Sequence, residues 1–340
     1  MATRSIVIAL SGRVFEGLAS DNLLHYVLNS AYSHSEDQAK TSSLISYSLA
    51  LYLAGISVSP FVASLFGNFT VSFFIAIGIF AVAIAYLQAF VPTLAPNTRI
   101  NLANDGHAEP NSHSTLIDFT LTLLTPLETF RRYPSTLLVG LSLLAYNIVQ
   151  SYMFTALLVH TSLYFHFTYR ENGLLISLAH IIAASYIFLN LYIIPRLYRS
   201  LRKSSRLSAS TQQPSTTSAR DTILALVSLF IEVLSLVEIG FAKSPRQIYA
   251  FTAMLALSLP ASSFIKAAFV AHFNGEEKSK GLASLAAMET MGSVLGPLIL
   301  GGFQTLSSTD NFVFFVAATM ACASAVLFGG GMCIMQTSRT

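Results

Sequence analysis

Residues 71–90 read VSFFIAIGIFAVAIAYLQAF, and residues 312–331 read FVFFVAATMACASAVLFGGG. Neither stretch contains a charged residue, and each matches the roughly 20 apolar residues that a helix needs to cross a bilayer. Further apolar blocks of this length recur along the 340-residue chain. They predict an all-α fold, a bundle of helices that span a membrane.

The overall composition supports lipid as the solvent of this protein. Hydrophobic residues make up 53% of the chain and charged residues only 10%, whereas a typical soluble domain carries about 25% charged residues. The formal net charge of +3 is too small to indicate a nucleic-acid partner. The composition therefore favours the bilayer as a partner and argues against a water-facing surface.

The two cysteines, Cys322 and Cys333, both fall in the last apolar block. Eleven residues of helix separate them by roughly 16 Å, which is beyond the reach of a disulfide. We expect ordinary buried thiols. No metal-binding or redox motif accompanies them, so the sequence predicts neither a metal site nor a cofactor.

Apolar blocks of about 20 residues or more give nine expected spans. The first is the weakest, because it carries Arg13, Glu16, Asp21 and His25. The expected spans cover residues 5–29, 43–66, 71–93, 136–160, 173–198, 221–242, 247–271, 282–305 and 311–335.

The distribution of lysine and arginine between alternate loops predicts the orientation of these spans. Cytoplasmic loops of membrane proteins are enriched in both residues. One set of alternate loops holds thirteen of the 19 lysines and arginines, the opposite set holds four, and Arg13 and Lys266 lie within spans. The first set, which includes the C-terminus, is therefore expected in the cytoplasm, with Met1 outside.

Two long connections lie on the expected cytoplasmic side. Residues 94–135 begin as a polar stretch and continue as LIDFTLTLLTPLETFRRYPS. This second part is apolar but too short to span, so it fits a helix lying in the membrane interface. Residues 199–220 are basic and rich in serine and threonine, which is typical of a flexible loop.

The sequence Asn68-Phe69-Thr70 matches the acceptor pattern for N-glycosylation. The expected topology places Asn68 outside, in a very short loop between two spans. The acceptor would lie close to the bilayer, so we expect little or no attached glycan.

A short pattern occurs twice, in the second and the eighth expected spans. The copies are GISVSP (Gly55, Ser59 and Pro60) and GSVLGP (Gly292, Gly296 and Pro297), the latter followed by Gly301. Small residues let helices approach closely in lipid, and membrane helices tolerate the kink that proline introduces. Each copy also follows a short loop with acids and lysine, SEDQAK or NGEEKSK. Two copies six spans apart predict a parallel internal repeat.

The second copy resembles the Gly-Pro antiporter signature of the major facilitator superfamily, and the first is a degraded copy with Ser59 where glycine is usual. In that family the copies belong to helices five and eleven, so residues 5–29 would be helix four. Helix four often has an arginine three or four residues before a glycine, and this chain has Arg13 and Gly17. The resemblance covers nearly the whole chain, and its general character is that of fungal members.

The resemblance implies the twelve-helix carrier fold without its first three helices. Residues 1–93 would hold three spans of the N-terminal half, 94–135 the central cytoplasmic loop, and 136–340 the six spans of the C-terminal half. It also implies secondary active transport of a small organic molecule by proton-coupled efflux. The expected partners are that molecule, protons and lipid, and the expected location is the plasma membrane rather than an internal membrane.

Arg13 and Glu16 are three residues apart and can pair on one face of the first span. By the resemblance to the family's helix-four arginine, they would serve proton coupling or gating. A structural ion pair that keeps the helix turned toward the bundle is the alternative.

Glu232 lies roughly 17 Å into the sixth span, near the membrane midplane. An ionisable residue at this depth is costly in lipid and indicates a functional site. A carboxyl there suits a proton carrier. The alternative is a protonated acid that is hydrogen-bonded to a neighbouring helix.

Asn147, Gln150 and Ser151 follow i, i+3, i+4 spacing and form a polar face at mid-depth in the fourth span. This span corresponds to family helix seven, a wall of the substrate cavity. Hydrogen bonding between helices explains the same residues.

Lys266 and Glu289 occupy the cytoplasmic thirds of the seventh and eighth spans. They could form a salt bridge between helices, but we favour a Lys266 side chain that extends to the interface. His160 and His180, toward the outer ends of their spans, are expected to be packing or interfacial residues.

No catalytic constellation is evident. The sequence has neither a phosphate-binding loop nor a nucleophile elbow, so it predicts neither ATP-driven transport nor an enzyme. The alternative function is a non-transporting membrane paralogue or fragment that acts as a partner or sensor. The substrate stays open, because an apolar cavity with a few polar groups fits many molecules.

Overall fold

The computed structural model of the chain describes residues 38–65, 69–90, 130, 134–193, 215–273, 276–306 and 311–337. Within these ranges the chain is helical and has no β-strand. Five of the described helices are long and apolar enough to cross a membrane. The expected all-α, multi-pass membrane fold is confirmed at this level. The expected first span lies outside the described residues.

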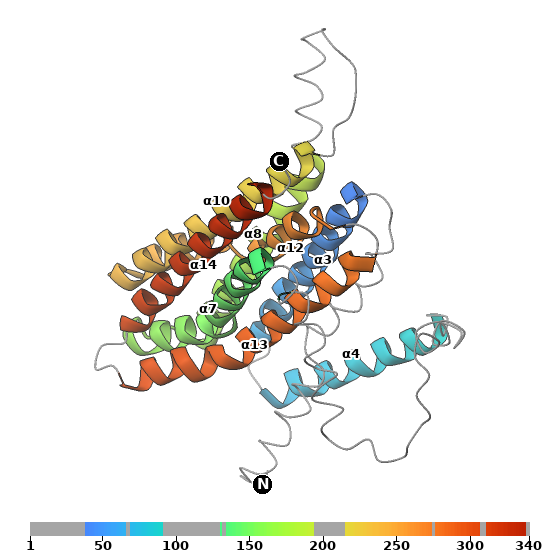
Figure 1. Cartoon of the computed structure of the whole chain (residues 1–340). Coiled ribbons are helices and arrows are strands. Elements are labelled where there is room, and N and C mark those ends of the chain that lie inside the picture. The colour runs from blue at the N-terminus through green and yellow to red at the C-terminus, as the bar shows by residue number, and fades with distance from the viewer. Residues whose placement is uncertain are drawn as a thin grey trace, which may run out of the picture.

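Two helices precede the main bundle in the chain. Helix α3 (Gln38–Leu65) packs along α8 (Tyr169–Phe188). Helix α4 (Phe69–Phe90) stands apart from the bundle in Figure 1, and its side chains from 74 to 86 are exposed to the surroundings. A helix that is apolar all round and exposed is suited to contact with lipid or with another apolar helix.

Helix α7 (Pro134–Tyr164) lies at the centre of the bundle, between α13 (Glu276–Leu306) and α14 (Phe312–Thr337). Small side chains let α7 and α14 approach closely. The hydroxyl of Ser142 donates to the carbonyl of Ser324 at 2.8 Å, and the hydroxyl of Ser324 donates to the carbonyl of Ser142 at 2.9 Å. Each serine therefore satisfies its own hydroxyl while it joins the two helices.

Helix α10 (Ser215–Phe241) packs along α14, as Figure 1 shows. It begins within the segment that we expected to be loop up to residue 220, so that boundary was wrong by six residues. The remainder of that loop lies outside the described residues, as does most of the expected interfacial helix at residues 116–135. The last two residues of that segment, Pro134 and Ser135, begin α7.

The seventh expected span is not one helix. It is divided into α11 (Pro245–Leu255) and α12 (Ala261–Val270), with a turn at residues 256–260 between them. Pro260 has no backbone N–H and cannot continue a helical hydrogen-bond ladder. The hydroxyl of Tyr146 on α7 donates to the carbonyls of Ser258 and Leu259, at 3.2 and 2.9 Å. The interruption is therefore stabilised by the neighbouring helix.

The ends of two helices are set by local sequence. Thr168 caps the start of α8 and pairs reciprocally with Glu171, and Ser244 does the same with Gln247 at the start of α11. Such boxes satisfy backbone N–H groups that have no partner in the first turn. At its other end α8 widens into a π-helical turn, η3 (Leu189–Ile193).

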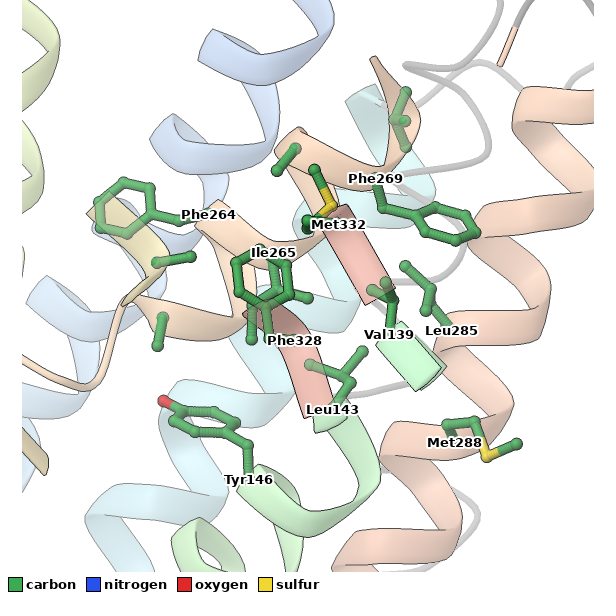
Figure 2. Close-up of a cluster of buried hydrophobic side chains, with 14 of the residues drawn as sticks. Val139, Leu143, Tyr146, Phe264, Ile265, Phe269, Leu285, Met288, Phe328 and Met332 are labelled. Carbon is green, nitrogen blue, oxygen red and sulfur yellow. The ribbon is translucent and has the colours of Figure 1, made fainter. Parts of the chain in front are cut away.

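A cluster of buried apolar side chains joins α12 to α7, α13 and α14. Figure 2 shows Leu143, Ile265, Phe269, Leu285 and Phe328 among its members, and all of them are 0% exposed. Since helices in lipid associate through close packing rather than through exclusion of water, this cluster holds the short helix α12 in place.

The expectation of buried thiols was wrong, because Cys322 and Cys333 are both exposed on α14. Both remain free thiols in the structure.

Candidate functional site

A cavity of about 250 Å³ lies between α3, α7, α8, α12 and α13. Helix α3 contributes a mainly apolar wall, and the other four helices contribute most of the polar groups. The lining residues are Ile45, Leu49, Tyr52, Leu53 and Ile56 of α3; Tyr146, Asn147, Gln150, Ser151 and Phe154 of α7; His180 of α8; Leu259, Ser262, Ser263 and Lys266 in and before α12; and Glu289 and Ser293 of α13.

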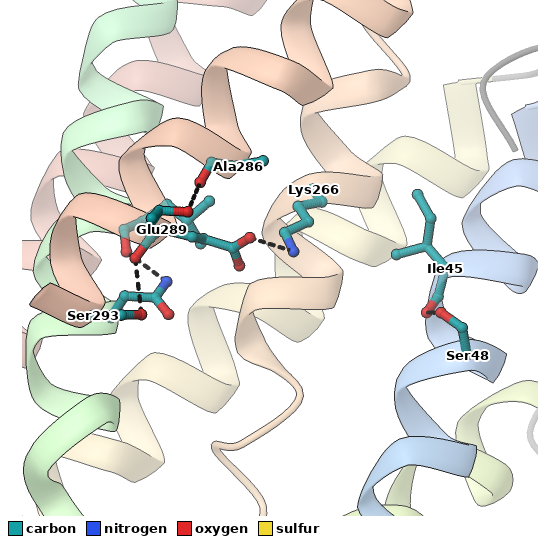
Figure 3. A network of polar contacts seen from close by, with 9 residues as sticks. Ile45, Ser48, Lys266, Ala286, Glu289 and Ser293 are labelled. Carbon is teal, nitrogen blue, oxygen red and sulfur yellow. Dashed lines mark hydrogen bonds and ion pairs between the residues drawn. The ribbon is translucent and has the colours of Figure 1, made fainter. Parts of the chain in front are cut away.

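A buried ion pair forms part of the cavity wall. The Lys266 Nζ atom lies 2.7 Å from Oε2 of Glu289, and the two side chains are only 8% and 5% exposed. Figure 3 shows the pair bridging α12 and α13. The favoured expectation, that Lys266 extends to the interface, was therefore wrong. The pair keeps both charges neutralised where an unpaired charge would be costly.

The amide of Gln150 connects the cavity to Glu232, which lies on α10 behind the wall. The Gln150 Nε2 atom donates to Glu232 Oε1 at 2.8 Å. Glu232 is 0% exposed, and its second oxygen, Oε2, has no hydrogen-bond partner among the described residues. The hydrogen bond to a neighbouring helix, which we considered for Glu232, is present. The proton-carrying role stays a prediction.

The structure places all three residues of the predicted polar face at the cavity. Asn147 Nδ2 donates to the carbonyl of Leu143 at 2.9 Å, and the hydroxyl of Ser151 donates to the carbonyl of Ile148 at 3.3 Å. Both bonds stay within α7, whereas the side chain of Gln150 donates to a residue of another helix, Glu232 on α10. Contact of the three with a substrate stays a prediction.

His180 was expected to be a packing or interfacial residue. It is buried beside Phe154, and it also lines the cavity, which the sequence analysis missed. Its Nδ1 atom lies 2.8 Å from the carbonyl oxygen of Ile176, and its ring lies 4.9 Å from that of Phe154 between centroids. The sequence held a partial signal, because Ala183 and Ala184, at i+3 and i+4 from His180, are small residues of the kind found where membrane helices meet. His160 is fully buried and packs against Phe314, as expected of a packing residue.

The glycine motif of α13 lies directly against the backbone of α7. A Cβ added to Gly292 would meet the carbonyl oxygen of Leu144 at 2.7 Å, and one added to Gly296 would meet that of Ile148 at 2.5 Å. This close approach brings the neighbouring residues of α13, including Glu289, to the cavity wall. The atoms nearest to a Cβ on Gly301 would belong to the Tyr152 side chain, at 3.3 Å or more.

The copy of the motif in α3 is placed differently. A Cβ added to Gly55 would meet nothing within 4 Å. Pro60 and Pro297 both lie inside helices that continue past them. The two copies thus share a sequence pattern and a helical setting, but a close approach to a neighbouring backbone is seen at Gly292 and Gly296 and not at Gly55. The side chain of Ser59 lies outside the described part of the structure.

Three predicted residues, Arg13, Glu16 and Asn68, lie outside the described residues. Within the described part of the chain, no group of three or more His, Cys, Asp or Glu side chains could hold a metal ion. The cavity can accept a small molecule with an apolar body against α3 and a polar end toward α7, α12 and α13. It can also hold charge within the membrane without leaving it unpaired.

No protein-family model matches the chain, and no curated protein matches it.

Proposed function

We propose that the chain is a secondary active transporter that moves a small organic molecule out across the membrane in exchange for protons. The observation that carries this proposal is the cavity between α3, α7, α8, α12 and α13, with the Lys266–Glu289 pair in its wall. Ionisable residues inside membrane helices are rare, face a bundle interior or an aqueous cavity, and are typical of substrate and ion pathways.

The mixed character of the lining supports an organic substrate. Binding sites for small molecules are mainly apolar, with a few polar groups that fix orientation. Here Leu49 and Leu53 offer apolar contact from α3, while Asn147 and Gln150 offer amide groups from α7. A molecule that bridges the two walls would be held by both α3 and the helices that follow the central connection.

The proposed architecture is that of the major facilitator superfamily from its fourth helix onward. In this assignment α3 and α4 belong to the N-terminal half, and α7 to α14 form the C-terminal half. The interrupted pair α11 and α12 counts as one span, which gives eight spans in the described residues and a ninth at 5–29. The packing of α3 against α8 supports this assignment, because it brings the two halves together around one cavity.

A flux measurement on the purified chain tests the proposal. Liposomes that contain the protein and a trapped pH-sensitive dye are loaded with single compounds from a panel of small amphipathic molecules, then diluted. Proton antiport makes the lumen acidify as the compound leaves. We expect acidification that requires both the protein and a particular compound. Protein-free liposomes loaded in the same way control for passive leakage.

The same measurement addresses the alternative function. If no compound in a broad panel produces protein-dependent acidification or release, the transport proposal fails. The chain would then be a non-transporting membrane protein that acts as a partner or sensor.

A further inference from the structure

Gln150 lies between two sites, because it lines the cavity and also contacts Glu232 behind the wall. Its amide nitrogen donates to Glu232 Oε1 at 2.8 Å. The amide oxygen accepts no hydrogen bond from the described residues. An amide held in this orientation therefore leaves its oxygen as a free acceptor for the cavity, while one of its two N–H donors is used by the carboxylate.

Protonation of Glu232 favours the opposite orientation of the Gln150 amide. An ionised carboxylate only accepts hydrogen bonds, so it requires the N–H side of the Gln150 amide. A protonated Glu232 carries an O–H, and Oε2 has no acceptor for it among the described residues. A buried donor without a partner is unfavourable, so the amide turns its oxygen toward the acid and its NH₂ toward the cavity.

We propose that the Gln150 amide couples proton binding at Glu232 to substrate binding in the cavity, and that the substrate presents an N–H or O–H donor to Gln150 Oε1. This inference rests on the proposed antiport function and extends it to a residue and a substrate class. A donor group fits only when the amide oxygen faces the cavity, which requires ionised Glu232. The substrate and the proton therefore exclude each other, as exchange requires.

Two neighbouring groups on the wall favour the same kind of substrate. The Nδ1 atom of His180 faces a carbonyl oxygen, which can only accept, so neutral His180 carries its hydrogen on Nδ1 and has an acceptor at Nε2. Asn147 donates to the carbonyl of Leu143 and keeps its own side-chain oxygen as an acceptor. A molecule with several donors at one end therefore complements this part of the cavity.

The ion pair favours a substrate without net charge. Lys266 and Glu289 already neutralise each other in the cavity wall. An added cation or anion would either break the pair or remain unpaired, and both are costly in a buried site. The class that fits is an uncharged amphipathic molecule, such as an alcohol or a primary amide, with an apolar body.

The titratable groups on the helices around Glu232 are hydrogen-bonded, ion-paired or exposed. Tyr146 on α7 is close enough for an electrostatic interaction, and its hydroxyl donates to carbonyls of the α11–α12 turn. Lys266 on α12 is paired with Glu289. On α11, Arg246 is exposed and Tyr249 donates to the carbonyl of Glu171. The titratable groups of α14 are the exposed cysteines.

Calorimetric titration of the purified full chain tests the coupling without requiring transport. The probes are primary amides of benzene, naphthalene and biphenyl carboxylic acids, each compared with its N,N-dimethyl counterpart, which keeps the acceptor and loses both N–H donors. Titrations in buffers with different heats of ionisation give the number of protons released per amide bound. A series of pH values covers the range from protonated to ionised Glu232.

We expect primary amides to bind and, at the acidic end of the series, to release about one proton each, as the reciprocity of linked binding requires. The proton leaves the Glu232 carboxyl for the solvent, and no other bond changes. The N,N-dimethyl amides should release none. Glu232→Gln carries an N–H donor at every pH, as protonated Glu232 carries an O–H, so this variant should bind primary amides weakly and release no proton. Gln150→Met, which keeps the side-chain length, should also lose the release.

Asn147→Leu is the matched control. It lies one turn from Gln150 and contacts Leu143 rather than Glu232. The affinity of Asn147→Leu for primary amides should fall, while the number of protons released per bound amide should stay the same.

The proposal is overturned if no primary amide binds, if the dimethyl amides release as many protons, or if Gln150→Met keeps the full release. Release that survives Glu232→Gln and disappears in Glu289→Gln would also overturn it, by moving the proton site to the ion pair. A chain that shows the predicted release but gives no flux in liposomes would contradict the proposed function alone.

Discussion

Lys266 on α12 and Glu289 on α13 form a 2.7 Å ion pair in the wall of the cavity. Helix α12 is short and follows an interruption, so this pair fixes its position relative to α13. The cost of burying two charges is offset by their attraction only while both are present. Single and double mutations at this pair therefore distinguish the stability lost by leaving one charge unpaired from the stability lost by removing a contact.

The first prediction concerns that balance. Lys266→Met and Glu289→Leu should each destabilise the protein by about 3–5 kcal/mol, because each leaves one buried charge without its partner. The double variant should be clearly more stable than either single variant, since no charge is left unpaired. Thermal unfolding in detergent measures all three. Single variants as stable as the double variant would show that the pair has no electrostatic role.

The second prediction concerns the contact between α7 and α13. Gly296→Ala should destabilise the protein by about 1–3 kcal/mol, the usual cost of overpacking, because the new Cβ would meet the carbonyl oxygen of Ile148 at 2.5 Å. Gly302→Ala, on the same helix, is the control, since a Cβ there would meet nothing within 4 Å. Equal stability of the two variants would contradict the packing described. For Gly296→Leu we expect this structural cost in addition to loss of transport.

The third prediction concerns the turn between α11 and α12. Tyr146→Phe should lower stability by about 1–3 kcal/mol, because the carbonyls of Ser258 and Leu259 lose their common donor. Amide hydrogen exchange at residues 256–260 should become faster. Tyr192→Phe serves as the control, since the Tyr192 side chain is exposed. Unchanged exchange in Tyr146→Phe would mean that the turn is held by other contacts.

Much of the helical framework could be predicted from the sequence, because length and apolarity alone identify helices in lipid. The interruption at residues 256–260 could not be predicted in this way. The surrounding sequence, MLALSLPASS, is as apolar as a continuous span, and proline occurs inside α3 and α13 without ending them. The break depends on Tyr146, a donor from a helix about 110 residues earlier in the chain.

The candidate site was predicted in part. The spacing of Asn147, Gln150 and Ser151 identified a polar helix face, but spacing cannot show which helices that face will meet. The Lys266–Glu289 pair was considered and not favoured, because pairing depends on how two helices are rotated about their axes. The same limit explains the error at Cys322, since lipid-facing and bundle-facing positions of α14 are both apolar.

The fourth prediction concerns topology. The bias of lysine and arginine places Ser208 in the cytoplasm. In a chain with Cys322→Ser and Cys333→Ser, the thiol of Ser208→Cys should resist membrane-impermeant reagents in intact cells and react after permeabilisation. Labelling in intact cells would reverse the predicted orientation of every span.

The central claim is that the transported molecule occupies the cavity. The most direct test introduces Ser293→Cys, at the cavity wall, into the chain with Cys322→Ser and Cys333→Ser. Thr319→Cys, on an exposed position of α14, is the control. With a compound that drives lumen acidification, we predict that a thiol reagent stops the flux only in the Ser293→Cys chain, and that the compound slows this reaction. Complete labelling of that thiol with undiminished flux would contradict the account.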